Sequence, residues 1–135
     1  MKKIIRASGL ILYRKEKGQT YYLLLRDDSG WNFPKGHMNE REKELETAMR
    51  ETEEETGIKI SSVLKEFKEK ISYFVDKNPK EVIFYLAEVS QKNVVLSSEH
   101  TEYGWFTFEE ALSKLSFENT KNLLKMAHKF LKTNE

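Results

Sequence analysis

The sequence contains no cysteine, and this absence removes several kinds of chemistry at once. Disulfide bonds, thiolate nucleophiles and cysteine-bound metals are all excluded, so any catalysis must rely on oxygen and nitrogen groups. A chain without disulfides is compatible with a reducing compartment, and we expect a cytoplasmic protein. Long apolar runs are lacking too, so no membrane partner is expected.

An excess of charge of one sign is also lacking, because 23 basic residues balance 22 acidic ones. A general attraction to nucleic acid or acidic membranes is therefore not expected, and we predict no stable nucleic-acid partner. The 135 residues are 39% hydrophobic and 12% aromatic, with only two prolines. This length and composition predict one globular domain over residues 1–135, which we expect to be a monomer or a weak dimer.

The pattern of apolar, aromatic and β-branched residues predicts both strands and helices. Strands are expected at 4–13, 21–25, 63–75 and 82–89. A turn at 77–80 should join the last two strands as a hairpin. Helices are predicted at 43–56, 108–115 and 119–131, the first of them ended by Gly57. Strands mixed with a few helices predict an α/β protein, in which helices cover the faces of a sheet.

The predicted helix at 43–56 places three glutamates on one face. At 100° per residue, Glu51, Glu54 and Glu55 occupy positions i, i+3 and i+4. Carboxylates this close repel each other and weaken a helix by roughly a few tenths of a kcal/mol per pair. A hard divalent cation such as Mg²⁺ or Mn²⁺ would offset the repulsion, because it prefers oxygen ligands. The plain alternative is a solvated acidic face on a surface helix.

The residues around these glutamates follow a longer motif with fixed gaps. It reads glycine, five residues, glutamate, seven residues, Arg-Glu, an apolar residue, one residue, Glu-Glu, one residue, glycine and an apolar residue. The fixed positions in this chain are Gly36, Glu42, Arg50, Glu51, Glu54, Glu55 and Gly57, followed by Ile58. This motif is the box of the Nudix hydrolases, and the chain resembles that family over nearly its whole length. Its one departure is Thr52, at a position where the box has an apolar residue.

The resemblance implies a Nudix fold, an α/β/α sandwich with a mixed sheet and a loop–helix–loop catalytic box. It also implies a metal-dependent enzyme that hydrolyses a phosphoanhydride bond in a nucleotide-type substrate. The groups then expected to hold Mg²⁺ or Mn²⁺ are Glu51, Glu54, Glu55 and the backbone at Gly36. Glu51 and Glu55 are also candidates for the base that takes a proton from the attacking water. The residues expected to support the box are Glu42, Arg50 and Gly57.

Segments outside the box resemble one branch of the family, the asymmetric diadenosine tetraphosphate hydrolases. The similar segments are 8–14, 31–37, 45–48, 50–52, 78–80 and 85–89, together with Glu99-His100 and Trp105. They imply a dinucleoside polyphosphate substrate, which would be cleaved to ATP and AMP. Two departures concern the substrate: Gly30 stands where those enzymes often have histidine, and Phe117 where they often have tyrosine.

Three charged residues outside the box are further candidates for the site. Lys35 and Lys80 are predicted to bind the phosphates, and Lys35 is also a candidate catalytic group. Glu99 resembles a second catalytic carboxylate in a polar loop. The alternatives are two solvated surface lysines and an ordinary loop acid, since a lysine is typically a mobile point charge.

Aromatic and histidine residues complete the list of candidates. Tyr73 and Phe117 could stack a base of the substrate, although aromatic residues more often belong to the core. His37 is a candidate for phosphate binding, and so is His100, but a histidine near a turn is usually structural or exposed. His128 is predicted to lie on the surface of the last helix.

Other functions remain open at this stage. Within enzymes, the chain could remove pyrophosphate or a cap from RNA 5′ ends, or hydrolyse diphosphoinositol or nucleoside polyphosphates. The balanced charge disfavours an RNA-binding enzyme, because phosphate neutralisation dominates such binding. From another class, it could be a non-catalytic metabolite-sensing domain. Sensor domains of this family typically lose box glutamates, whereas every one is present here.

Overall fold

The computed structural model describes residues 3–134 and arranges them around a seven-stranded sheet. The strands are β1 (Ile5–Glu16), β2 (Gln19–Asp27), β3 (Gly30–Asn32), β4 (Lys35–His37), β5 (Leu64–Val75), β6 (Asn78–Glu88) and β7 (Glu102–Phe106). The helices are α1 (Glu44–Thr56), α2 (Phe108–Lys114) and α3 (Glu118–Thr133). Met1, Lys2 and Glu135, which the predicted domain includes, lie outside the described residues.

One parallel pair of strands makes the sheet mixed. The strand order is β3-β2-β1-β6-β5, with β4 also paired to β1 and β7 to β2. β1 and β6 are parallel, from Ile5 opposite Lys80 to Tyr13 opposite Glu88, and the other pairs are antiparallel. Every residue of β1 from Ala7 to Arg14 is buried, which is the pattern of a strand covered on both faces.

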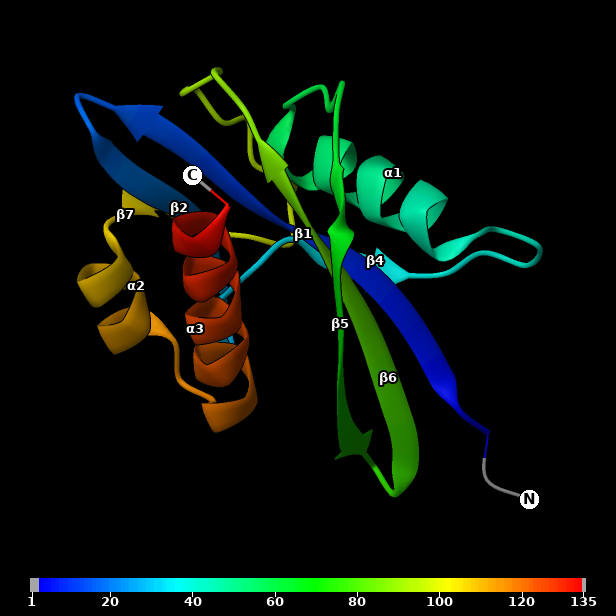
Figure 1. Ribbon diagram of the computed structural model, residues 1–135. Coiled ribbons are helices and arrows are strands. Elements are labelled where there is room, and N and C mark those ends of the chain that lie inside the picture. Colours follow the sequence, from blue (N-terminus) through cyan, green and yellow to red (C-terminus); the bar gives the residue numbers. More distant parts are fainter. Residues whose placement is uncertain (1–2, 135) are drawn as a thin grey trace.

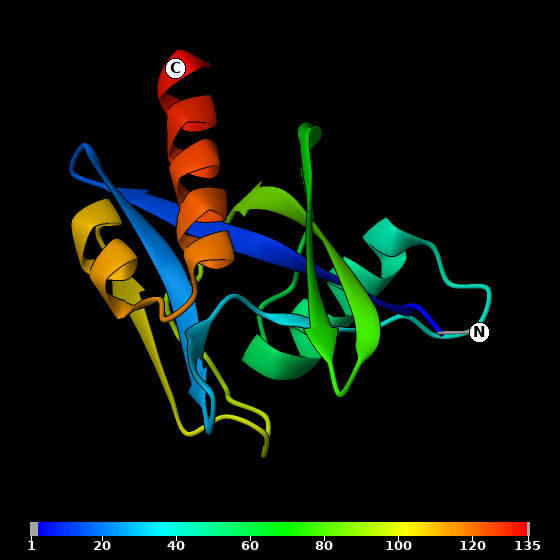
Figure 2. The same cartoon turned by 90° about the horizontal axis from the view of Figure 1, so that it is seen from below.

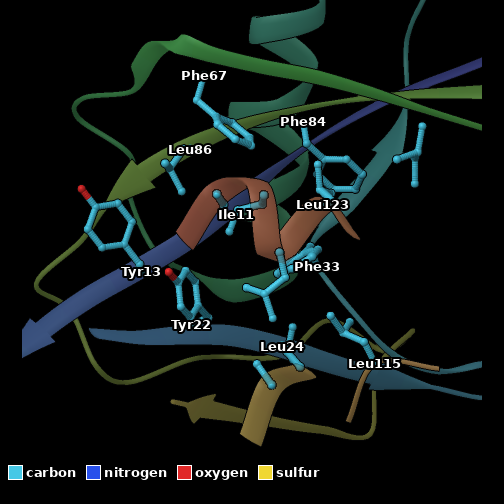
Figure 3. Packing of buried hydrophobic residues seen from close by; sticks show 14 of the residues in the cluster. Ile11, Tyr13, Tyr22, Leu24, Phe33, Phe67, Phe84, Leu86, Leu115 and Leu123 are labelled. Atoms are coloured by element: carbon cyan, nitrogen blue, oxygen red, sulfur yellow. The ribbon is translucent and has the colours of Figure 1, made fainter. Parts of the chain in front are cut away.

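Helices cover the two faces of this sheet, α1 on one face and α2 with α3 on the other (Figures 1 and 2). Side chains of β1 alternate between the two resulting cores: Leu10 and Leu12 face α1, whereas Ile11 and Tyr13 face α3. Figure 3 shows the α3 side, where Leu123 lies among aromatic residues of the sheet. The predicted α/β/α sandwich is confirmed. No helix within residues 3–134 is long and apolar enough to cross a membrane.

The hairpin between β5 and β6 differs from its prediction. Its turn is Asp76-Lys77 and not 77–80, so Pro79 and Lys80 belong to β6. Asp76 and Lys77 have φ angles of 49° and 71°, and two consecutive positive φ angles suit a two-residue turn that follows the twist of the strands. Pro79 is tolerated because it lies at the beginning of its strand. Lys80 is therefore held by strand pairing instead of by a turn.

Three short strands, β3, β4 and β7, have no counterpart among the predicted strands. They contain three, three and five residues, too few for alternation to be distinctive. Each one is defined by pairing with a long strand, β7 and β3 with β2, and β4 with β1. The pairing of β4 with Ala7–Gly9 fixes the start of the box beside the centre of the sheet.

Candidate active site

α1 presents its charged side to a cleft because its opposite side is packed on the sheet. Ala48 and Thr52 are fully buried, and Leu45 and Met49 pack against the same core. The helix begins at Glu44, one residue later than predicted, and ends at Thr56, with Gly57 as its C-cap. Gly57 has a φ of 70°, a left-handed conformation that glycine adopts without strain.

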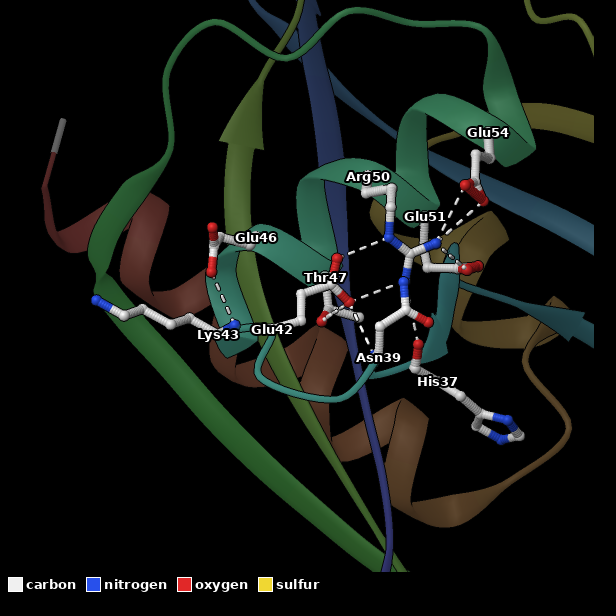
Figure 4. A network of polar contacts seen from close by, with 9 residues as sticks. All are labelled: His37, Asn39, Glu42, Lys43, Glu46, Thr47, Arg50, Glu51 and Glu54. Carbon is white, nitrogen blue, oxygen red and sulfur yellow. Dashed lines mark hydrogen bonds and ion pairs between the residues drawn. The ribbon is translucent and has the colours of Figure 1, made fainter.

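Arg50 joins the loop before α1 to the helix itself (Figure 4). Its Nε and Nη2 atoms donate to the two carboxylate oxygens of Glu42 at 2.7 and 2.9 Å. Its Nη1 atom donates to Glu51 at 3.2 Å and to Glu54 at 3.1 Å. Hydrogen bonds from Arg50 lower the pKa of Glu42 to about 2. This geometry fits the support role predicted for Glu42 and Arg50.

Glu51 and Glu55 lie one helical turn apart and are largely deprived of water. The side chain of Glu55 is 7% exposed, and burial together with the charge of Glu51 raises its pKa to about 8. Burial also raises the pKa of Glu51, although Arg50 opposes this shift. A Cβ atom at Gly36 would overlap the carboxylate of Glu51, so only glycine leaves room for that carboxylate. The backbone N–H of Lys35 donates to Glu55 Oε1 at 3.3 Å.

A cleft of about 360 Å³ brings these glutamates together with residues from distant parts of the chain. Its lining consists of Ala7, Lys35, Gly36, His37, Asn39, Arg50, Glu51, Glu55, Lys80 and Glu99. Burial and the charge of Lys35 lower the pKa of Lys80. The pKa of His37 is lowered by burial and by both lysines. The cleft therefore places the carboxylates of Glu51 and Glu55 close to each other, and likewise the ammonium groups of Lys35 and Lys80.

Four residues predicted to contact metal or substrate, His100 among them, do not line this cleft. Glu54 has a side chain that is 55% exposed and is bound to Arg50. Phe117 is 49% exposed just before α3, so the alternative that it belongs to the core is wrong. Tyr73 is half-buried, and the Nζ atom of Lys80 lies 5.7 Å from the centroid of its ring. Tyr73 is thus connected to the cleft through Lys80.

The structure also places two residues that the sequence did not mark. Asn39 lines the cleft from a variable position of the box loop, where no motif signals it. His128 was predicted on the surface and is half-buried instead: its Nδ1 atom lies 2.8 Å from the hydroxyl of Tyr22, and its ring stacks on Phe108 at 4.2 Å. The helical pattern of α3 did not reveal this contact, because Tyr22 belongs to β2, which is distant in the sequence.

The donor set of the cleft suits a hard divalent cation. Carboxylates of Glu51, Glu55 and Glu99 share it with the Gly36 backbone, and raised pKa values show that two carboxylates are poorly compensated. Within residues 3–134, no three acidic or histidine side chains lie close enough together in this conformation to hold an ion. The ligand set therefore stays a prediction.

The fold and the box helix define a class of protein: the chain belongs to the Nudix family, and a model of the NUDIX domain matches residues 3–128. It is a Nudix hydrolase. The asymmetrical bis(5′-nucleosyl)-tetraphosphatase of Rattus norvegicus is 41% identical, over 94% of this chain and 95% of that protein. A crystal structure of a C. elegans Ap4A hydrolase binary complex has a TM-score of 0.91 at 32% identity, covering 96% of this chain and 98% of that one.

A different kind of enzyme is also among the relatives. The mRNA-decapping protein g5R of African swine fever virus is 33% identical over 76% of this chain. The match covers 48% of the viral protein, so this chain corresponds to about half of its length.

Proposed function

We propose that this Nudix hydrolase cleaves dinucleoside polyphosphates asymmetrically, converting diadenosine tetraphosphate and water to ATP and AMP. The observation that carries the proposal is the crowding of like charges of both signs in one cleft. Glu51 and Glu55 require a cation, and Lys35 and Lys80 require an anion. A polyphosphate with its divalent cation satisfies both requirements. The names of the rat and nematode relatives support a dinucleoside tetraphosphate as this polyphosphate.

Glu51, Glu55 and the Gly36 backbone would hold Mg²⁺ or Mn²⁺, and Glu54 would join them by exchanging its Arg50 contact for the ion. The ion would lower the pKa of bound water and neutralise phosphate charge. The chain's own groups do the rest. Glu51, Glu55 or Glu99 takes the proton of the water that attacks phosphorus. Lys35 and Lys80 hold the phosphate chain in line and stabilise the charge that develops as the anhydride P–O bond breaks. ATP and AMP then leave.

The remaining predicted residues have roles in substrate binding. Tyr73, in contact with Lys80, is proposed to stack one base next to the phosphates. Phe117 offers an exposed ring for the same purpose. His37, next to both lysines in the cleft, is proposed to donate to a phosphate oxygen. The predicted monomer or weak dimer, the single domain and the cytoplasmic location stay predictions.

RNA 5′-end hydrolysis is the second candidate, and the viral decapping relative is the observation in its favour. The balanced charge of the chain weighs against it. Hydrolysis of diphosphoinositol polyphosphates would use the same charges of the cleft. A metabolite-sensing role has no comparable support, because the box glutamates are all present.

A substrate panel tests these proposals directly. The purified protein is incubated with Mg²⁺ in ¹⁸O-labelled water and diadenosine tetraphosphate, nucleoside triphosphates, a diphosphoinositol polyphosphate or 5′-triphosphorylated RNA. Mass spectrometry of the products should show ATP and AMP as the main pair, and the label shows which phosphorus was attacked. Formation of two ADP molecules, or faster turnover of RNA or of a mononucleotide, would reject the proposed substrate and leave the Nudix assignment standing.

A further inference from the structure

A histidine that lies outside both the box and the cleft lining contacts one of the box glutamates. The side chain of His100 is 10% exposed and does not belong to the cleft lining. Its Nε2 atom lies 3.9 Å from Oε1 of Glu55, and its Nδ1 atom lies 3.4 Å from the hydroxyl of Ser97. We propose that His100 is a positioning residue, which holds the Glu55 carboxylate in the orientation that the hydrolytic reaction needs. This inference rests on the proposed function, since it assigns a role to a partner of Glu55.

Backbone hydrogen bonds fix the loop that carries His100, both at His100 and at the residue after it. The backbone N–H of His100 donates to the carbonyl of Ser97 at 3.2 Å. The next residue, Thr101, donates its N–H to the carbonyl of Arg26 at 2.8 Å, which ties the loop to β2. With its backbone held on both sides and its ring buried, His100 has little freedom to turn into the cleft. The ring is therefore placed to act on Glu55 and not on a phosphate.

The two nitrogens of the ring have complementary partners. In the neutral tautomer with the proton on Nε2, the N–H faces the Glu55 carboxylate and Nδ1 accepts from the Ser97 hydroxyl. The distance of 3.9 Å exceeds that of a hydrogen bond, so the ring and the carboxylate are in close contact without one. The N–H of Lys35 donates to the same Oε1 atom at 3.3 Å. The ring and the Lys35 backbone therefore lie against one oxygen of the carboxylate, and we expect them together to limit its rotation.

Groups that orient an active carboxylate without touching the substrate act mainly on turnover. Loss of such a partner typically costs about 10- to 100-fold in metal affinity or activity. Because His100 does not reach the cleft, KM should be nearly unaffected. A purely structural histidine would instead lower thermal stability and leave kcat of the folded fraction unchanged.

Four variants separate these roles: His100→Leu, His100→Gln, Ser97→Ala and the control Glu102→Gln. The Gln amide nitrogen can occupy the place of Nε2, so His100→Gln should restore most of the activity that His100→Leu loses. Ser97→Ala removes only the partner of Nδ1 and should have an intermediate effect. Glu102 belongs to the adjoining strand, has a 53% exposed side chain and pairs with Arg26 outside the cleft, so it controls for disturbance near the loop.

Measurements comprise kcat and KM on the best substrate of the panel, the Kd of Mn²⁺ alone by electron paramagnetic resonance, and the Tm of each variant. For His100→Leu we expect kcat or Mn²⁺ affinity to fall about 10- to 100-fold with KM within about twofold. Unchanged kcat and Mn²⁺ affinity in folded His100→Leu would overturn the proposal. A raised KM at unchanged kcat would also overturn it, because His100 would then bind substrate. If diadenosine tetraphosphate is not cleaved, the proposed function fails, while the Mn²⁺ titration and the panel's best substrate still decide the role of His100.

Discussion

The loop before α1 and the last turns of that helix differ in how their carboxylates are compensated. Glu42 receives two hydrogen bonds from Arg50, and its pKa falls to about 2. Glu55, buried near Glu51, has a pKa of about 8. The first carboxylate is satisfied within the protein and stabilises it, whereas the second is left for a ligand at a cost in stability. Within one motif, one glutamate therefore supports the structure, whereas another is available to bind a ligand.

The largest effect should come from removing the charge of Glu55. We expect Glu55→Gln to lower kcat by several orders of magnitude, because a metal-binding or proton-accepting carboxylate is lost. The metal-free protein should be as stable as the wild type or more stable, since Gln avoids both the buried charge and the proton uptake that folding imposes on Glu55. Glu54→Gln should lower kcat in the same way if Glu54 is also a ligand. Steady-state kinetics with Mg²⁺ and thermal unfolding without metal provide the check, and near-normal turnover of both variants would refute the metal site.

The second-largest effect should be on the pH dependence of stability, which differs between Glu55 and Glu42. Folding raises the pKa of Glu55 from 4.5 to about 8, so its contribution is fully present below pH about 4.5 and is lost as pH rises toward 8. We expect the metal-free wild type to lose roughly 2–4 kcal/mol relative to Glu55→Gln across this range. Urea unfolding of both proteins at several pH values measures the difference. Parallel stability curves would show that Glu55 titrates normally.

Lys80→Met should affect the opposite charge in the cleft. If Lys80 meets a phosphate, the lost charge-assisted contact is worth roughly 1.5–3 kcal/mol. This corresponds to about a 10- to 150-fold loss in kcat/KM. Stability should hold, because Lys80 is half-buried and burial with Lys35 already lowers its pKa. Kinetics on dinucleoside polyphosphates of different length test this point: the loss should shrink for short chains, and an equal loss for all chains would contradict phosphate binding.

Glu42→Gln should destabilise the scaffold and leave the chemistry less disturbed. Hydrogen bonds to charged groups contribute roughly 1.5–3 kcal/mol, so the free energy of unfolding should fall by that amount at pH 7. Folding lowers the pKa of Glu42, so its contribution is present above pH about 4.5 and is lost as pH falls toward 2. The stability difference from the wild type should therefore vanish in acid. A loss of kcat as large as that of Glu55→Gln would make Glu42 part of the site.

The smallest effect is expected at Thr52, on the buried side of the same helix. Its hydroxyl is buried and finds no hydrogen-bond partner among the described residues. Thr52→Val keeps the shape and removes the unsatisfied hydroxyl, so unfolding should cost about 1 kcal/mol more. Chemical denaturation measures the change, with Thr56→Val as the contrast because the Thr56 hydroxyl donates to Thr52 O at 2.6 Å. A destabilised Thr52→Val protein would mean that the hydroxyl has a partner.

Local patterns predicted those parts of the fold that local interactions determine. The helix at 43–56 was predicted to within one residue, because its formers and its terminal glycine act over a single turn. The turn before β6 lies at Asp76-Lys77 and not at 77–80, because the positive φ angles of these two residues, which no sequence pattern marks, allow a shorter turn. β7 was missed, since five residues become a strand only by pairing with β2.

The site shows the same division. The box spacing predicted that Glu51 and Glu55 lie together, and both line the cleft. The i,i+4 spacing of Arg50 and Glu54 on one helix is enough to indicate their ion pair. Nothing local indicated that His100 lies beside Glu55. That contact follows from tertiary packing and not from the order of residues along the helix.

The parallel pairing of β1 with β6 has a consequence for synthesis on the ribosome. The hydroxyl of Ser8 donates to the carbonyl of Ile83, a contact that spans 75 positions. At about 5–20 residues per second, one edge of β1 waits roughly 4–15 s for its partner strand. Such long-range pairing is slow and leaves a buried apolar strand exposed to aggregation meanwhile. Lys80 lies opposite Ile5 and joins the cleft only when β6 pairs with β1. The cleft is therefore completed late in the synthesis of the chain.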